Sequence, residues 1–194
     1  QVPAILWSAL IPAASEMEAR SDKDRLRELY LRSTKYVALL VMPMVAFTGG
    51  AAGLLIPVWQ GFDTHWGTSV VVLQWMVFGY IANILPGPGV TVVLGMGRPE
   101  VQMRAGLISL TANIALTLLL VKIIGFWGIP VATVISMYLS WGWFVHAMHR
   151  VVDVGAVTLW RESIRGATVA SIPVVLFAFG GSMLSTSITS RVEG

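Results

Sequence analysis

Long apolar stretches separated by short polar segments dominate the chain. Three stretches are nearly free of charged residues: 36–97, with Asp63 alone, 105–149, with Lys122 alone, and 166–190. A helix needs about 20 apolar residues to cross a hydrocarbon core about 30 Å thick, so the first two stretches are long enough for two crossings each. The pattern predicts five complete transmembrane helices and the end of a sixth, at 36–60, 69–95, 103–121, 129–148 and 167–187, with 1–14 as the partial span.

The basic residues segregate by side of this predicted arrangement. All but two of the 13 Lys and Arg residues fall in alternate loops, and the remaining two, Lys122 and Arg191, fall on the opposite side. Basic loops face the cytoplasm, so the 15–35 loop is predicted to be cytoplasmic and the 36–60 span to run outward. The 21–37 and 157–165 segments have helical apolar spacing. They are interpreted either as helices in the membrane interface or as solvated loops.

Composition supports the same fold class. The chain is 56% hydrophobic and 12% charged with a mean hydropathy of +0.75, whereas soluble domains carry about 25% charged residues. A net charge of +3 that is concentrated in membrane-flanking loops does not point to a nucleic acid partner. The absence of cysteine excludes disulfides, thiolate zinc sites and thiol nucleophiles. We therefore expect an all-α membrane protein, a polytopic helical bundle, with the lipid bilayer as partner and no cofactor.

Small and neutral polar residues form three stripes inside the predicted spans. Each stripe follows helical spacing along one face of its span. The stripes comprise Tyr80, Asn83, Gly87 and Thr91; Gly106, Ser109, Asn113 and Thr117; and Thr133, Ser136 and Ser140. Such faces suit a wet cavity for a polar, hydroxyl-rich substrate. They also suit close packing of transmembrane helices, and this alternative stays open.

The 84–90 segment predicts a break deep inside a span. Pro86 and Pro88 lack backbone donors, and Gly87 beside them weakens the helix. Broken helices at membrane depth serve as hinges or substrate contacts in transporters, or persist as static kinks. Pro86, Gly87 and Pro88 are therefore the candidate hinge residues.

Catalytic motifs are weak by comparison. The sequence has no Walker-type phosphate loop, and no span carries an ionisable residue near its middle. His146 and His149 lie three residues apart without a nearby third ligand, and Asp153 and Glu162 are too dispersed to suggest an acid-base pair. We predict no catalytic residue, no metal site and no enzymatic activity.

The order of several short motifs adds a family resemblance. The motifs include Gly-Met-Gly-Arg-Pro at 95–99, and the others lie at 9–16, 26–33, 39–43, 54–59, 111–120 and 125–136. In this order the chain resembles the carboxy-terminal lobe of a polysaccharide flippase of the multidrug/oligosaccharidyl-lipid/polysaccharide exporter superfamily. The resemblance covers most of residues 5–150. We accordingly expect residues 1–194 to be a fragment, the carboxy-terminal transmembrane lobe of a two-lobed transporter.

The resemblance implies a function and a set of partners. The whole protein would flip a polyprenyl-diphosphate-linked oligosaccharide from the cytoplasmic to the external leaflet by alternating access. Its partners would be that substrate and an amino-terminal lobe, in a bacterial or archaeal plasma membrane. The candidate substrate contacts are Tyr80, Asn83, Thr91, Ser109, Asn113, Thr117 and Lys122. A drug/cation antiporter of the same superfamily and a membrane-embedded glycosyl or acyl transferase remain as alternatives.

Overall fold

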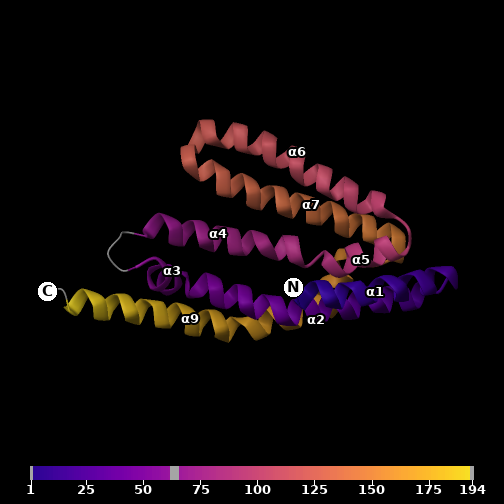
Figure 1. Cartoon of the computed structure of the whole chain (residues 1–194), viewed down its shortest axis with the longest axis horizontal. Coiled ribbons are helices and arrows are strands. Elements are labelled where there is room, and N and C mark those ends of the chain that lie inside the picture. The colour runs from indigo at the N-terminus through magenta and orange to yellow at the C-terminus, as the bar shows by residue number, and fades with distance from the viewer. Residues whose placement is uncertain (1, 62–65, 193–194) are drawn as a thin grey trace.

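The computed structural model describes the backbone of residues 2–61 and 66–192, and the side chains of residues 10–61 and 66–180. The described chain is a bundle of long helices lying roughly along one axis (Figure 1). The helices are α1 (Val2–Ala19), α2 (Lys23–Gly50), α3 (Ala52–Gln60), α4 (Gly67–Ile84), α5 (Gly87–Gly95), α6 (Pro99–Ile124), α7 (Gly128–Val152), α8 (Ala156–Leu159) and α9 (Arg165–Val192). The predicted fold class, an all-α polytopic membrane protein, is confirmed. Asp63 lies outside the described residues.

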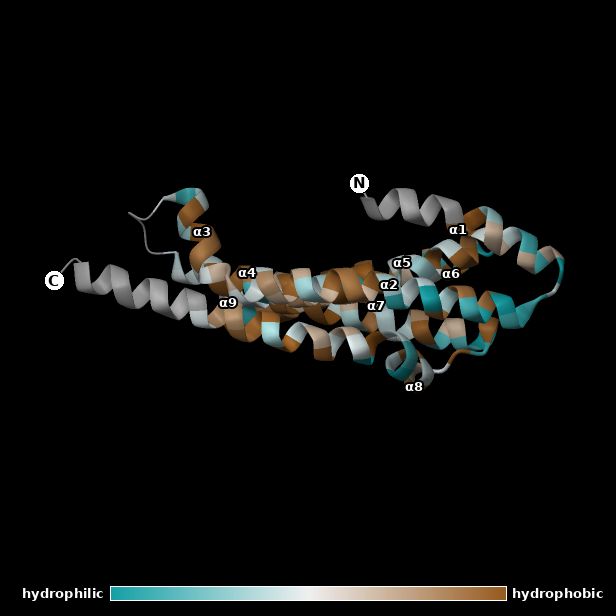
Figure 2. Ribbon diagram, turned by 90° about the horizontal axis from the view of Figure 1, so that it is seen from below, coloured by the Kyte–Doolittle hydropathy of each residue, from teal (hydrophilic) through white to brown (hydrophobic). Residues whose placement is uncertain are grey.

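Three helical stretches are long and apolar enough to cross a membrane: Gly67–Gly95, Pro99–Val152 and Ala156–Gly180. The bent pair α2 and α3 adds a fourth if the two helices together form one span. The apolar residues form a band across the middle of the bundle, and the polar residues gather at the end where α8 and the α1–α2 connection lie (Figure 2). The exact crossings, and the side that faces the cytoplasm, stay predictions.

Helix α2 shows two features of the amino-terminal region that the sequence pattern did not specify. The segment predicted as an interfacial helix or a loop is the first part of α2, which continues without a break toward Gly50. The cap of this helix is Asp22, whose Oδ1 accepts a hydrogen bond from the Arg25 backbone N–H at 3.2 Å. The 36–60 stretch is also not one straight helix, because α3 departs from α2 at an angle of 70°.

The predicted break in the 69–95 stretch is present. Helix α4 ends at Ile84 and α5 begins at Gly87, with Leu85 and Pro86 between them. In an unbroken helix the N–H groups of residues 86 and 88 would donate to the carbonyls four residues earlier, and proline has no N–H to donate. The helical hydrogen bonding is therefore interrupted where the sequence removes two backbone donors, while Leu85 and Pro86 keep helical φ and ψ angles.

The stretch Pro99–Val152 is a helical hairpin. Helices α6 and α7 are joined by a 3-10 turn, Gly125–Trp127, and lie antiparallel side by side (Figure 1). The approach is closest beside the turn, where a Cβ on Gly128 would lie 2.5 Å from the Leu120 carbonyl carbon. At 1.5 Å per residue each arm is about 38 Å long, which is enough to span a bilayer core of about 30 Å.

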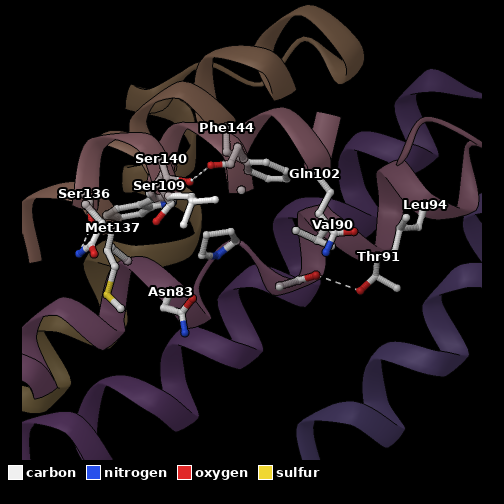
Figure 3. Close-up of a pocket in the computed structure, with 18 of the residues that line it drawn as sticks. Asn83, Val90, Thr91, Leu94, Gln102, Ser109, Ser136, Met137, Ser140 and Phe144 are labelled. Atoms are coloured by element: carbon white, nitrogen blue, oxygen red, sulfur yellow. Dashed lines mark hydrogen bonds between the residues drawn. The ribbon is translucent and has the colours of Figure 1, made fainter. Parts of the chain in front are cut away.

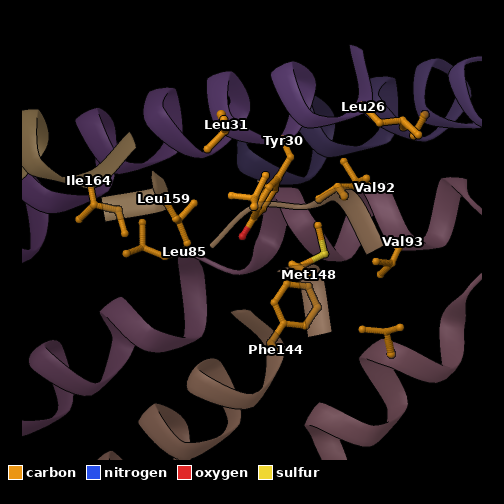
Figure 4. Close-up of a cluster of buried hydrophobic side chains, with 14 of the residues drawn as sticks. Leu26, Tyr30, Leu31, Leu85, Val92, Val93, Phe144, Met148, Leu159 and Ile164 are labelled. Carbon is orange, nitrogen blue, oxygen red and sulfur yellow. The ribbon is translucent and has the colours of Figure 1, made fainter. Parts of the chain in front are cut away.

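The buried core lies toward the end of the bundle that holds the basic loops. Tyr30 on α2, Phe144 and Met148 on α7, and Val92 on α5 are almost fully buried against one another (Figure 4). Gly89 allows this packing, because a Cβ there would lie 2.8 Å from both the Phe144 and Tyr30 rings. This core fixes the broken helix α4–α5 against both α2 and the hairpin.

Candidate functional site: a polar cavity beside the broken helix

A cavity of about 940 Å³ lies between the α4–α5 break, α6 and α7 (Figure 3). Its volume falls within the range of about 300–1,000 Å³ that is usual for small-molecule sites. The break itself supplies Pro86 and Gly87 to the wall. Ile11 of α1 and Phe144 of α7 also line it, the latter at the buried core. The cavity is therefore bordered by elements from several parts of the chain.

The three polar stripes converge on this cavity. Each of the three stripes contributes three of its residues to the lining. The helical spacing of the polar residues therefore identifies the face of each helix that borders the cavity. These residues are Asn83, Gly87 and Thr91 from α4–α5; Gly106, Ser109 and Asn113 from α6; and Thr133, Ser136 and Ser140 from α7. That they contact a substrate stays a prediction.

Hydrogen bonds join the two arms of the hairpin within this wall. The Asn113 side-chain amide donates to Thr133 Oγ1 at 3.2 Å and to Ser136 Oγ at 3.4 Å. The Ser140 hydroxyl donates to the Ala105 carbonyl at 2.8 Å, one turn nearer to the core. Thr133 and Ser136 each donate their own proton to a backbone carbonyl of α7. These bonds hold the polar wall in one arrangement, and the hydroxyl oxygens keep acceptor capacity.

Other polar side chains at the cavity are not engaged in this network. Within the described part of the chain, Asn83, Gln102 and Ser109 make no side-chain hydrogen bond. Asn83 is exposed and comes from the last turn of α4, immediately before the break (Figure 3). These groups can donate to and accept from hydroxyls of a guest molecule without first breaking a protein hydrogen bond.

The cavity is polar without being charged. None of the described residues that line it is ionisable. Its lining therefore offers amides, hydroxyls and apolar carbon, which suit the hydroxyl groups and ring faces of sugars. The part of the lining that the structure describes offers no group that is suited to proton transfer near neutral pH.

Four of the predicted site and hinge residues do not line the cavity. Tyr80 lies on α4 with half of its surface exposed elsewhere, and Thr117 lies one turn beyond Asn113, where α6 closes on α7. Lys122 is exposed near the hairpin turn. Pro88 is buried in the core, whereas its neighbours Pro86 and Gly87 reach the cavity.

Sequence reasoning missed some of the lining. Gln102 and Trp141 are both at the cavity, from α6 and α7. Gln102 lies one helical turn before Gly106, so extending the second stripe by four residues would have found it. Trp141 follows Ser140 directly and carried no such signal, because a Trp in a predicted span is also typical of a membrane interface.

The residues considered for an enzymatic site are scattered. His149 Nδ1 lies 3.6 Å from Asp153 Oδ1 at the exposed end of α7, and His146 is exposed one turn earlier. Glu162 belongs to a separate pocket. Among the described residues, no group of three or more His, Asp or Glu could hold a metal ion.

Comparisons with known proteins give one family match. The model of a family described as "Polysaccharide biosynthesis protein" matches residues 1–71, which cover α1 to α3 and the start of α4. No curated protein and no solved structure matches the chain. The matched region contacts the cavity through α1, whereas the hairpin lies outside the match. Over its first 71 residues the chain is similar to polysaccharide biosynthesis proteins, and this similarity supports a polysaccharide-related function in a multi-pass membrane protein.

Proposed function

We propose that the chain forms one wall of a transporter that flips a lipid-linked oligosaccharide from the cytoplasmic to the external leaflet by alternating access. The observation that carries this proposal is the cavity of about 940 Å³, lined by uncharged hydrogen-bonding side chains beside a broken helix. The family match supports the polysaccharide part of the proposal. The membrane is the plasma membrane of a bacterium or archaeon, and the chain performs no covalent chemistry.

The cavity addresses the main barrier to such transport. Moving a hydroxyl from water into an apolar medium without a hydrogen bond costs about 2–7 kcal/mol, and an oligosaccharide carries many hydroxyls. Asn83, Gln102 and Ser109 present unengaged donors and acceptors to the cavity. Exchanging water for these groups lowers the cost for the glycan, while the polyprenyl chain stays in the lipid.

The diphosphate needs a different partner. The described cavity lining holds no cation that could neutralise it. We assign this role either to cations at the rims or to an amino-terminal lobe that closes the cavity from the opposite side. The candidate rim cations are Lys122, which is exposed beyond the cavity, and Arg98, whose guanidinium lies 3.4 Å from the Glu18 carboxylate. The cavity wall on this chain is thus proposed to select the sugar portion.

Filling the cavity tests this proposal. Gly106 lines the cavity, and a Cβ built there meets no atom within 4 Å, so Gly106→Trp places an indole in the open space. The gene that carries this chain is replaced by the variant in its own host, and surface glycan and intracellular lipid-linked precursor are measured. We expect loss of surface glycan and accumulation of the precursor.

The chain offers a matched control. Gly142 on α7 also has open space at its Cβ position, is exposed, and does not line the cavity. Gly142→Trp adds the same bulk to a helix of the same hairpin, so export should continue. Normal export by Gly106→Trp, with the protein present in the membrane at its usual amount, would contradict the proposal.

A further inference from the structure

A second pocket lies where α2 meets the 157–167 segment. Its volume is about 560 Å³. Three cations, Lys35, Arg161 and Arg165, line it together with the apolar side chains of Leu39 and Val157. We call this site the basic pocket. It shares no residue with the cavity, so its role is separate from the proposed glycan pathway.

The three cations of the basic pocket have no acidic partner in the described part of the chain. Among the described residues, none of them forms an ion pair, although Glu162 also lines the pocket. Four other arginines form ion pairs: Arg20 with Glu16, Arg25 with Asp22, Arg32 with Glu28 and Arg98 with Glu18. Among the described residues, Arg27, Arg104 and Arg150 form none. Three cations facing one carboxylate leave an excess of positive charge, which favours an anionic ligand.

The pocket is built on a fixed backbone. The 160–164 segment is π-helical, with the Arg165 N–H donating to the Trp160 carbonyl five residues back. Ser163 is buried and its hydroxyl donates to the Leu31 carbonyl of α2 at 2.9 Å, which fastens this segment to α2. Short π-helical insertions occur frequently at functional sites. Here the insertion carries Arg161, and Arg165 follows it directly.

The surroundings of the pocket match the boundary between lipid and water. Trp160 and Tyr36, which precede Arg161 and follow Lys35 in the sequence, are 47% and 69% exposed. Exposed aromatic residues of this kind are usual in the interfacial belt. Val157 beside them is 71% exposed. A molecule in this pocket would thus touch charged groups on one side and apolar groups on the other, which is the polarity of a phospholipid.

We propose that the basic pocket binds the phosphate head group of an anionic phospholipid from the adjacent leaflet. Basic pockets between transmembrane helices bind anionic lipid head groups, and arginine forms paired hydrogen bonds with phosphate oxygens. A zwitterionic lipid brings its own cation and gains less from three unpaired basic residues. The bound lipid would join α2 to the 160–164 segment and the start of α9, beside the Ser163–Leu31 bond that already fastens this segment to α2.

Native mass spectrometry of the full chain tests the site. The chain is released from micelles that contain equal amounts of phosphatidylglycerol and phosphatidylcholine, and the bound lipids are counted. We expect one phosphatidylglycerol to be retained in preference. The variant Lys35→Gln/Arg161→Gln/Arg165→Gln should bind phosphatidylglycerol with an affinity at least about tenfold lower. The reason is that each lost charge-assisted hydrogen bond weakens binding.

Two further variants separate the site from general charge. The variant Lys23→Gln/Arg104→Gln/Arg150→Gln removes the same charge from exposed positions outside the pocket, and it should retain the lipid. Arg161→Lys/Arg165→Lys keeps the charge and should retain most of the binding. If both triple-glutamine variants lost phosphatidylglycerol equally, the attraction would be nonspecific and the proposal would be overturned. Unchanged lipid binding by the Lys35→Gln/Arg161→Gln/Arg165→Gln variant would also overturn it. Thermal unfolding confirms that each variant is folded.

The source of the phosphate is tested with inorganic phosphate. Millimolar phosphate should leave the retained phosphatidylglycerol in place, because the free ion makes no contact with the apolar wall. Displacement of the lipid by phosphate alone would make the pocket a site for a soluble anion and would overturn the lipid assignment. None of these measurements depends on glycan export, so their outcome is independent of the proposed function.

Discussion

The Asn113 side chain of α6 donates a hydrogen bond to Thr133 Oγ1 of α7 at 3.2 Å, on the wall of the polar cavity. The two residues are 20 positions apart along the chain, and the hairpin turn brings them together. The same amide therefore contributes to packing between two helices and to the surface that a guest molecule would meet. The two contributions differ in size, and this difference separates them experimentally.

We predict that Asn113→Leu reduces glycan export much more than it reduces stability. Hydrogen bonds between transmembrane helices contribute on average about 0.6 kcal/mol, so the unfolding temperature in detergent should fall only slightly. Export should fall about threefold to tenfold, because a substrate hydroxyl then faces leucine and loses its partner. Export is measured as surface glycan in the native host.

Thr117→Val is the control for this substitution. Thr117 belongs to the same stripe of α6 but does not line the cavity, so neither export nor unfolding temperature should change. If Thr117→Val lowered export as much as Asn113→Leu does, the stripe would act through helix packing, and the cavity would lose its proposed role.

Cysteine labelling tests whether the cavity holds water. The chain has no cysteine of its own, so a single introduced thiol reports on one position. Ser109→Cys should react with a membrane-impermeant maleimide, because the reactive thiolate forms only where water reaches it. Leu107→Cys should stay unlabelled: Leu107 is 50% exposed on α6 at a similar depth, but it does not line the cavity. Equal labelling of both would indicate a loose helix, not a water-filled cavity.

Helical spacing predicted much of the cavity, and the contacts between helices set its limits. The spacing placed Asn83, Ser109 and Asn113 on the correct faces, because a face follows from a period of 3.6 residues. It could not exclude Thr117, which is in register with Asn113. The arms of the hairpin converge toward Leu120 and Gly128, so the cavity ends before Thr117 is reached.

The sequence predicted one of the two helix breaks and not the other. The break after Ile84 was visible in the sequence, since two prolines remove backbone donors there. The 70° bend at Ala51 was not predicted, although Gly49 and Gly50 precede it. Gly50 packs closely against α9, where an added Cβ would lie 2.9 Å from the Ala178 Cβ. Two glycines in an apolar run fit either a straight span or a bend, and this tertiary contact is invisible in the sequence pattern.

We predict that Gly128→Ala destabilises the hairpin. The added Cβ would lie 2.5 Å from both the Leu120 carbonyl carbon and the Val121 nitrogen, which are backbone atoms that cannot rotate away. Overpacking of this kind costs about 1–3 kcal/mol, so the thermal unfolding temperature in detergent should drop measurably. Gly142→Ala meets no neighbour and should hold or raise that temperature, since alanine favours a helix by about 1 kcal/mol over glycine. An unchanged unfolding temperature for Gly128→Ala would mean that the two arms are farther apart than described.

The broken helix α4–α5 leads to a prediction about conformational change. Pro86 lies between the two helices and borders the cavity, and Pro86→Ala restores an N–H that can donate to the Ala82 carbonyl. If transport requires this junction to bend and straighten, the alanine variant should favour the straight form and export more slowly. A bias of about 1.4 kcal/mol toward one form reduces the other tenfold, so surface glycan should fall while the unfolding temperature does not. Pro43→Ala makes the same change inside α2, which is continuous on both sides of Pro43, and should leave export unchanged. Normal export by Pro86→Ala would make the break a static feature that shapes the cavity wall without moving.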